Sequence, residues 1–320
     1  MKVSINKEDY SEKVLKECHK LIEPYIHNTP VLSSRLIDEM VGAKVYFKCE
    51  NFQRMGAYKM RGATHAILKL SPDQRAKGVV THSSGNFAQA LALAAQALGV
   101  TAYIVMPTDA PKVKKSAVTD YGGKIVECEP NLEARKAAAA NIALQTGASF
   151  LHPSNDMDVI LGQGTACMEF LQEHPELDYI FVPVGGGGLI AGTALAAHFF
   201  SKGARVIGAE PFEVDDAYRS FHSGRIETNK TTNTIADGLK TVLGDRTLPI
   251  ILRLVDKIIR VEEKEISSAM KLIWERMKIV VEPSSAVALA ALIRASEEYQ
   301  NSTIGVIISG GNVDLSKLPF

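Results

Sequence analysis

Residues 177–200, LDYIFVPVGGGGLIAGTALAAHFF, join a short β-branched run to an alanine-rich run through four consecutive glycines. The first run has the composition of a buried β-strand, and the second has the length and the small apolar residues of a buried helix. A strand, a tight glycine loop and a helix in this order are typical of βαβ units, which build parallel sheets. The stretch therefore predicts an α/β fold.

The same alternation recurs on both sides of this stretch. Three strand–helix cycles lie between about residues 78 and 149, and two more strands follow at RVIGAEP (205–211) and TIGVIISGGN (303–312). We expect two α/β lobes, with parallel or mixed sheets flanked by helices and a ligand in the cleft between the lobes. The large domain is predicted to be discontinuous, residues 1–75 and 151–320, and the small domain to span 76–150.

Composition excludes several classes of protein. Lys+Arg and Asp+Glu both number 36 in 320 residues, so no net field attracts nucleic acid or an anionic membrane. No apolar run reaches the roughly 20 residues of a membrane span, and the polar start of the chain lacks the apolar stretch of a signal peptide. The four cysteines form no CxxC pair, which favours reduced thiols in a cytoplasmic protein over a zinc site or disulfides.

The glycine loop favours a phosphate site. Successive N–H groups without side chains can point at one anion, and the following helix adds its dipole. The simpler alternative is a sharp strand-to-helix turn, although one or two glycines would suffice for that. No Lys-Ser/Thr pair follows and the pattern is not GxGxxG, which disfavours an ATPase or a dinucleotide dehydrogenase. The residues concerned are Gly185, Gly186, Gly187 and Gly188.

Two further polar loops follow predicted strands, SSGN at 83–86 and SGGN at 309–312. Because the carboxyl ends of parallel strands border one crevice, all three loops are expected to open towards the same cleft. Each loop by itself could be only a turn. Lys59, in ENFQRMGAYKMRGA (50–63), adds an amine. Together these features suggest a phosphorylated carbonyl cofactor held as a Schiff base.

Seven motifs in order resemble those of the fold-type II pyridoxal-phosphate enzymes (tryptophan synthase β-like). The resemblance is greatest to the serine racemase and serine/threonine dehydratase group, and it covers almost the whole chain. The motifs are ENFQRMGAYKMRGA, SSGNFAQALALAA, LGQGT, PVGGGGLIAG, TIADGL, EPSSAVALAAL and ISGGNVDL. The resemblance implies pyridoxal 5′-phosphate as the cofactor and a homodimer as the assembly.

The resemblance also implies roles for single residues. Lys59 would be the Schiff-base lysine and the base at the substrate Cα, and Ser84 would exchange a proton on the opposite face. The serine at position 84 permits racemisation without proving it, because related dehydratases also carry SSGN. Ser83, Ser84, Asn86 and Arg135 would contact the substrate, although Arg135 is equally well explained as an exposed helix arginine. Cofactor contacts are implied for Lys59, Tyr58, Asn86, Gly185, Gly186, Gly187, Gly188, Glu282 and Ser309.

The segment GAEPFEVDD (208–216) resembles the divalent-cation loop of the same group. Glu210 and Asp216 would be carboxylate ligands, and the carbonyl of Val214 would be a third. Such hard oxygen ligands suit Mg²⁺, or else Ca²⁺ or Mn²⁺. An acidic surface loop without a metal is the alternative.

Three positions depart from the pattern of the group. Phe87 replaces the usual histidine after SSGN, Ala57 replaces a serine near the Schiff base, and Arg54-Met55 replaces the Lys-Thr of the animal racemases at part of their nucleotide site. These departures leave the substrate preference and any nucleotide effector open. The eight histidines show no metal-ligand spacing, and we expect them to be structural or to lie on the surface.

The resulting hypothesis is a serine racemase with serine/threonine dehydratase activity, which releases a 2-oxo acid and ammonia from β-hydroxy amino acids. L-threo-3-hydroxyaspartate dehydration is the alternative, with Arg135 pairing with the extra carboxylate. A non-catalytic protein that binds pyridoxal phosphate or another phosphate is a third possibility, against which Lys59 and Ser84 argue. β-Replacement fits the fold but matches the GGGGL and GAEP segments less well.

Overall fold

The computed structural model describes residues 10–320. The first nine residues, which begin both the predicted large domain and the polar N-terminal stretch, lie outside this range. None of the helices described is long and apolar enough to cross a membrane.

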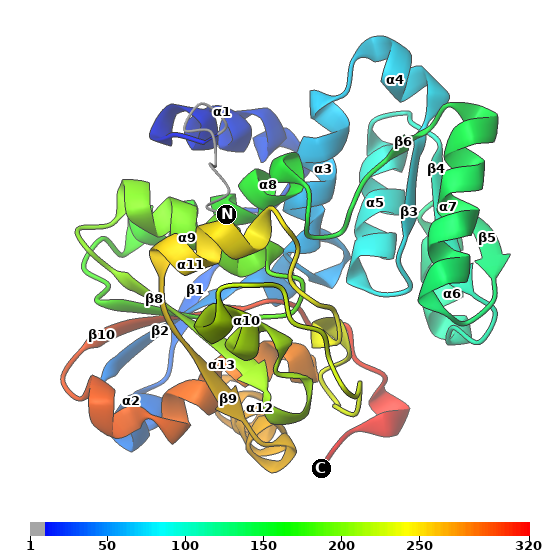
Figure 1. Cartoon of the computed structure of the whole chain (residues 1–320). Coiled ribbons are helices and arrows are strands. Elements are labelled where there is room, and N and C mark those ends of the chain that lie inside the picture. Colours follow the sequence, from blue (N-terminus) through cyan, green and yellow to red (C-terminus); the bar gives the residue numbers. More distant parts are fainter. Residues whose placement is uncertain (1–9) are drawn as a thin grey trace.

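A mixed six-stranded sheet forms the centre of the larger lobe (Figure 1). All its neighbouring strands are parallel except for the β1–β2 pair at one edge, which is antiparallel. The strands lie in the order β1 (Val31–Ser33), β2 (Lys44–Cys49), β10 (Thr303–Ile308), β7 (Tyr179–Pro183), β8 (Arg205–Pro211) and β9 (Val255–Val261).

Helices cover both faces of this sheet because successive strand side chains point to opposite sides. On β7, Ile180 and Val182 pack against one group of helices, whereas Phe181 packs against the other. The first group is α1 (Glu12–Ile22), α8 (Met157–Glu173), α9 (Gly188–Phe200) and α11 (Thr247–Leu254). The second is α2 (Arg35–Val41), α12 (Glu263–Met277) and α13 (Pro283–Arg294). The prediction of a strand, glycine loop and helix over 177–200 is confirmed by β7 and α9.

A second, parallel sheet lies in the smaller lobe. Its strands lie in the order β5 (Lys124–Cys128), β4 (Ala102–Pro107), β3 (Val79–His82) and β6 (Ser149–Phe150). Around it lie α4 (Pro72–Lys77), α5 (Asn86–Ala97), α6 (Lys112–Asp120) and α7 (Leu132–Thr146). The expected α/β fold, with parallel and mixed sheets flanked by helices, is confirmed.

Helix α3 (Lys59–Lys69) joins the two lobes through its packing. Its apolar face, with Met60 and Ile67, belongs to the same core cluster as Phe87 and Leu91 of α5 and Val159 of α8. A helix that precedes residue 76 therefore contributes to the core of the smaller lobe. The domain boundaries at residues 75/76 and 150/151 stay a prediction.

Candidate active site

Lys59 is the first residue of α3 and follows a tight turn. Met55 and Gly56 both have positive φ, 54° and 76°, which turns the chain sharply before the helix. The turn packs on the loop after β10, because the N–H of Tyr58 donates to the carbonyl of Ser309 at 3.0 Å and Gly311 donates to Gly56 at 2.9 Å. The contact between these two segments therefore fixes the position of Lys59 at the start of α3.

The amine of Lys59 is left free for chemistry. It lies 4.9 Å from the centre of the Tyr58 ring. The side chain is half-buried, and among the hydrogen bonds and ion pairs of residues 10–320 none involves its Nζ. A lysine held in a partly dry site without a carboxylate partner is suited to bond covalently to a carbonyl.

Arg61, two residues further along α3, holds the helix in place. Its guanidinium is fully buried and pairs in a bidentate manner with Glu50, at 2.8 Å, and with Glu169 of α8, at 2.7 Å. Burial acts against its charge, but the two carboxylates outweigh this and raise the pKa of Arg61. Since paired buried charges are costly to separate, this network keeps the first turn of α3 in one position.

The glycine loop after β7 fits a phosphate. Gly187 has φ of 82°, and a Cβ on Gly186 would lie 2.3 Å from Ser154 Oγ, so side chains are excluded. The loop is buried, and the first N–H of α9 that bonds to the preceding turn is that of Ala191, to the carbonyl of Gly187. The N–H groups before it form no hydrogen bond within residues 10–320, which leaves a buried cradle of donors at a helix N-terminus.

Polar side chains from both lobes meet beside this cradle. Asn86, the first residue of α5, donates to both carboxylate oxygens of Glu282 at 2.9 and 3.0 Å, and accepts from Asn312 at 3.0 Å. Ser309 lies 2.9 Å from Ser285 through their hydroxyl oxygens. The loops SSGN and SGGN therefore do meet, as expected from their places after β3 and β10. Asn312 and Ser285 are additional members of this cluster, and their only sequence signal was their position inside SGGN and EPSS.

Burial raises the pKa of Glu282 to about 7, although the hydrogen bond from Asn86 opposes the rise. The nearby charge of Asp237 adds to it, and Lys114 and Lys59 act in the other direction. The carboxyl of Glu282 therefore changes its charge near neutral pH.

We expect Glu282→Gln to remove one pH-dependent component of stability. As pH rises from about 4.5 to 7, the Glu282 carboxyl ionises in the unfolded chain before it does so in the folded protein. The stability that the protonated carboxyl contributes below pH 4.5 is therefore lost across this window. The shift corresponds to about 3 kcal/mol. Urea unfolding of the cofactor-free protein at pH 5 and pH 8 measures the free energy of unfolding. This free energy should be higher for the variant, relative to the wild type, at pH 8 than at pH 5. An equal difference at both pH values would contradict the shift.

The remaining substrate candidates lie around the smaller lobe. Ser83 and Ser84 are half-buried in the loop before α5, where the Ser83 hydroxyl accepts from the N–H of Gly85 at 3.4 Å. Arg135 on α7 is half-buried, and its Nε is shielded from solvent without a hydrogen-bond partner in the described chain. Phe87 is buried in the core of the smaller lobe and is 1% exposed, so it fills the interior.

The predicted cation loop places two carboxylates close together. Glu210 accepts from the N–H groups of Ala217 and Tyr218 at 3.0 and 2.8 Å, and Asp216 accepts from Asn229 at 2.7 Å. Burial, reinforced by Asp216, raises the pKa of Glu210 well above its usual value, and burial raises that of Asp216 to about 6. Two buried carboxylates of this kind fit a cation. Within residues 10–320, however, no group of three His, Cys, Asp or Glu side chains is arranged to hold a metal.

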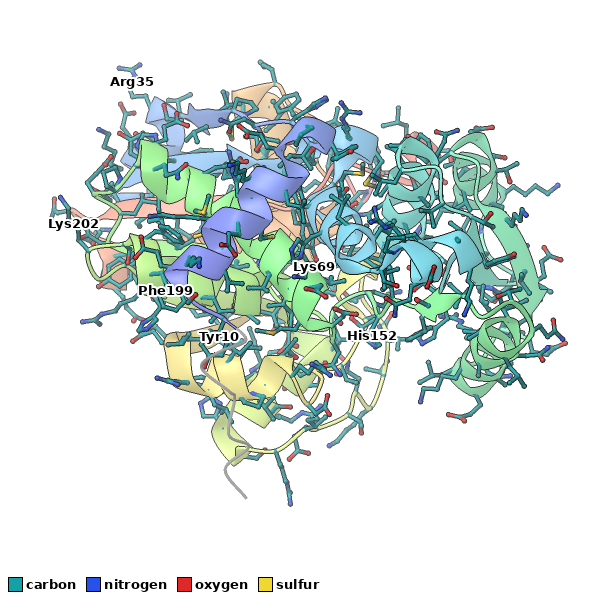
Figure 2. All side chains as sticks on the ribbon, turned by 90° about the horizontal axis from the view of Figure 1, so that it is seen from above. Tyr10, Arg35, Lys69, His152, Phe199 and Lys202 are labelled. Atoms are coloured by element: carbon teal, nitrogen blue, oxygen red, sulfur yellow. The ribbon has the colours of Figure 1, made fainter. Side chains whose placement is uncertain are left out.

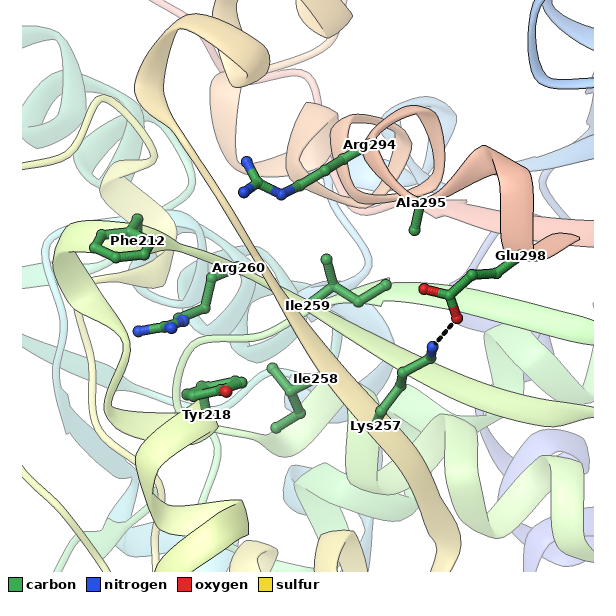
Figure 3. Close-up of a pocket in the computed structure, with 9 residues that line it drawn as sticks. All are labelled: Phe212, Tyr218, Lys257, Ile258, Ile259, Arg260, Arg294, Ala295 and Glu298. Atoms are coloured by element: carbon green, nitrogen blue, oxygen red, sulfur yellow. Dashed lines mark hydrogen bonds and ion pairs between the residues drawn. The ribbon is translucent and has the colours of Figure 1, made fainter.

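A cavity of about 350 Å³ lies elsewhere, at the outer edge strand β9 (Figure 3). Arg260 is stacked between the rings of Phe212 and Tyr218, and Lys257 pairs with Glu298. None of the candidate site residues lines this cavity, so it plays no part in the chemistry argued from the glycine loop and Lys59.

Residues 22–310 match the family model described as "Pyridoxal-phosphate dependent enzyme". The chain belongs to this family. Its cofactor is therefore pyridoxal 5′-phosphate, for which the lysine and the glycine cradle provide a fitting site.

The relatives of this pyridoxal-phosphate enzyme include racemases and ammonia-lyases. The chain is 48% identical to the serine racemase of Dictyostelium discoideum, with 96% of each chain covered. It is 47% identical to the beta-hydroxyaspartate dehydratase of Paracoccus denitrificans, over 94% of this chain and 96% of the relative. The crystal structure of the Dictyostelium discoideum racemase has a TM-score of 0.92, covering 96% of this chain and all of that one. The expected family and kind of enzyme are confirmed.

Proposed function

We propose that the protein is a serine racemase with serine/threonine dehydratase activity. Three features of residues 10–320 support the proposal: the Lys59 amine without a hydrogen-bond or ion-pair partner, the buried glycine loop with free N–H groups, and the half-buried Ser84 in the loop before α5. Its similarity to a serine racemase supports the substrate class. The alternative, L-threo-3-hydroxyaspartate dehydration, is supported by nearly equal identity to a hydroxyaspartate dehydratase.

In this proposal the cofactor site is built from the larger lobe. The N–H groups of Gly185–Gly188 would hold the phosphate, and Tyr58 would contact the ring. The neutral hydroxyl of Ser309 would be the partner of the ring nitrogen, and a neutral partner would favour racemisation and elimination over transamination. Bound pyridoxal phosphate supplies an electron sink for the pair left when the Cα–H bond breaks.

The substrate is held and deprotonated by residues of both lobes. Ser83 and Asn86 bind its carboxylate beside the N-terminus of α5, and Arg135 reaches it from α7. The amine of Lys59 removes the Cα proton. For racemisation the Ser84 hydroxyl donates a proton to Cα from the other face and regains one from solvent. For dehydration the β-hydroxyl leaves as hydroxide and takes up the proton that Lys59 removed from Cα, which gives water; hydrolysis then gives the 2-oxo acid and ammonia.

Parallel incubations test the function directly. Purified protein loaded with pyridoxal phosphate and Mg²⁺ is given L-serine, D-serine, L-threonine or L-threo-3-hydroxyaspartate, and 2-oxo acid and serine enantiomers are followed together. Formation of D-serine from L-serine establishes the racemase. Fastest release of 2-oxo acid from hydroxyaspartate, without D-serine, favours the alternative. Bound cofactor without turnover of any substrate would support a non-catalytic protein.

A divalent cation, Mg²⁺ or else Ca²⁺ or Mn²⁺, is proposed at Glu210, Asp216 and the carbonyl of Val214. The homodimer, a nucleotide effector and a cytoplasmic location stay predictions. So does the small lobe, residues 76–150, as a domain that closes over the substrate.

We expect Glu210→Ala to abolish stabilisation by Mg²⁺. A cation that binds only the folded state adds about 2.7 kcal/mol at 100 times its Kd, so the melting temperature of the wild type should rise with Mg²⁺ and that of the variant should not. Glu213→Gln, on an exposed acid of the same loop, is the matched control and should respond like the wild type. An unchanged Mg²⁺ response in Glu210→Ala would remove the metal from this site.

A further inference from the structure

The turn formed by His152, Pro153, Ser154 and Asn155 lines the glycine loop. A Cβ on Gly188 would lie 3.0 Å from the carbonyl oxygen of Ser154, and one on Gly186 would lie 2.3 Å from its hydroxyl. On its other side the turn contacts the segment before α11, because Asn155 accepts from the N–H of Arg246 at 2.9 Å. The turn is therefore one wall of the phosphate cradle, and a shift in it would move the glycine loop or open a gap beside it.

His152 shapes this turn through one ring nitrogen. Its Nδ1 accepts from the backbone N–H of Asn155 at 2.8 Å and from that of Ser154 at 3.2 Å. This arrangement is the histidine counterpart of an Asx-turn, in which a side-chain acceptor binds N–H groups further along the chain. Because Nδ1 must be the acceptor, the ring proton is assigned to Nε2.

The surroundings of His152 keep the ring neutral. Burial lowers the pKa of His152 to about 4, and the nearby His82, Lys59 and Lys136 act in the same direction, against Asp245. The ring also packs edge-on against His82 and Phe150, with centroids 6.1 and 6.3 Å apart. Figure 2 shows His152 where the two lobes adjoin. At neutral pH Nδ1 therefore stays an acceptor, and the contacts leave the ring little freedom to turn.

We propose that His152 is a positioning residue of the cofactor site, which holds Ser154 against the glycine loop by accepting two backbone hydrogen bonds at Nδ1. The inference rests on the proposed phosphate role of that loop. It assigns to His152 a role in cofactor affinity, whereas the sequence pattern suggested only a structural or surface histidine.

Two substitutions of His152 by amide residues distinguish the role of Nδ1 from that of Nε2. The Oδ1 of asparagine occupies the place of Nδ1, whereas the amide of glutamine reaches the place of Nε2, so His152→Asn can rebuild the turn and His152→Gln cannot. We measure pyridoxal-phosphate Kd for each holoenzyme by equilibrium dialysis, reading the cofactor absorbance. We expect His152→Asn to bind within about threefold of the wild type, and both His152→Gln and His152→Ala to bind at least tenfold more weakly. As a check on folding, the gel-filtration elution and the far-UV circular dichroism spectrum of all three variants are compared with those of the wild type.

The possible outcomes are distinct. The role of Nδ1 would be overturned if all three variants bound pyridoxal phosphate as tightly as the wild type, or if all three lost the same amount of affinity. Wild-type affinity in His152→Gln would also overturn it. A rescue by asparagine alone supports it, because a general loss of packing would not distinguish two amides of similar chemistry. Failure of the proposed function has another signature: the wild type itself would then not take up pyridoxal phosphate, or would bind it in the same way after Lys59→Ala.

Discussion

Replacement of Lys59 by alanine is expected to abolish racemisation and dehydration together, with turnover falling by about 10⁴-fold or more. A positioned proton-transfer group contributes up to about that factor, and the covalent attachment of the cofactor is lost at the same time. The amine of Lys59 has no ion-pair partner in residues 10–320, so its removal leaves no buried charge unpaired. The loss should therefore appear in turnover and in the cofactor spectrum rather than in folding.

Lys69→Ala is the matched control for this variant. Lys69 lies in the last turn of the same helix and is exposed. The control should keep wild-type turnover and spectrum. Residual 2-oxo acid release by Lys59→Ala at more than a few per cent of the wild-type rate would mean that another group removes the Cα proton.

Ser84→Ala is expected to separate the two reactions. Formation of D-serine from L-serine should fall by about 10³-fold, within the range for one positioned acid or base, while 2-oxo acid release from L-serine persists. The reason is that inversion needs a proton donor on the face opposite Lys59, whereas elimination needs only the base. Enantiomer analysis and 2-oxo acid release from the same incubation provide both rates.

Ser83→Ala tests whether any change in this loop has the same effect. Ser83 is the neighbouring half-buried serine and is proposed to bind the substrate carboxylate. The Ser83→Ala variant should have a higher KM for both reactions, and the ratio of the racemisation rate to the dehydration rate should be nearly unchanged. If Ser84→Ala still forms D-serine at the wild-type rate, the proton on the second face comes from another group.

Part of the site could be predicted because its residues are close in sequence. The strand, glycine loop and helix at 177–200 are one local unit, and the period of the apolar residues indicates which face of each element is buried. Since β7 and β10 are parallel strands of one sheet, the loops after them lie at the same edge. The loop after β3 belongs to the second sheet and meets the loop after β10 where the two lobes pack together.

Other features depend on residues far apart in the chain. The contact of Asn86 with Glu282 joins positions 196 residues apart, and Arg61 reaches Glu169 across 108. Phe87 follows a substrate-binding motif and is nevertheless buried in the core, because the helical turn carries position 87 to the inner face of α5. No local pattern contains the two long-range pairings, whereas the burial of Phe87 agrees with its helical spacing from Leu91.

The sequence by itself determined the α/β class and the glycine loop, because strand propensity, helix period and glycine conformational freedom act within a few neighbouring residues; Lys59 was singled out by the resemblance of its motif to those of the pyridoxal-phosphate enzymes. The tertiary structure alone decided what surrounds them. Burial sets the pKa of Glu282 near 7, the meeting of two lobes pairs it with Asn86, and the packing of the 152–155 turn brings Ser154 to the glycine loop. Desolvation and long-range contact are properties of the packed chain, so these features arise only when the lobes are assembled.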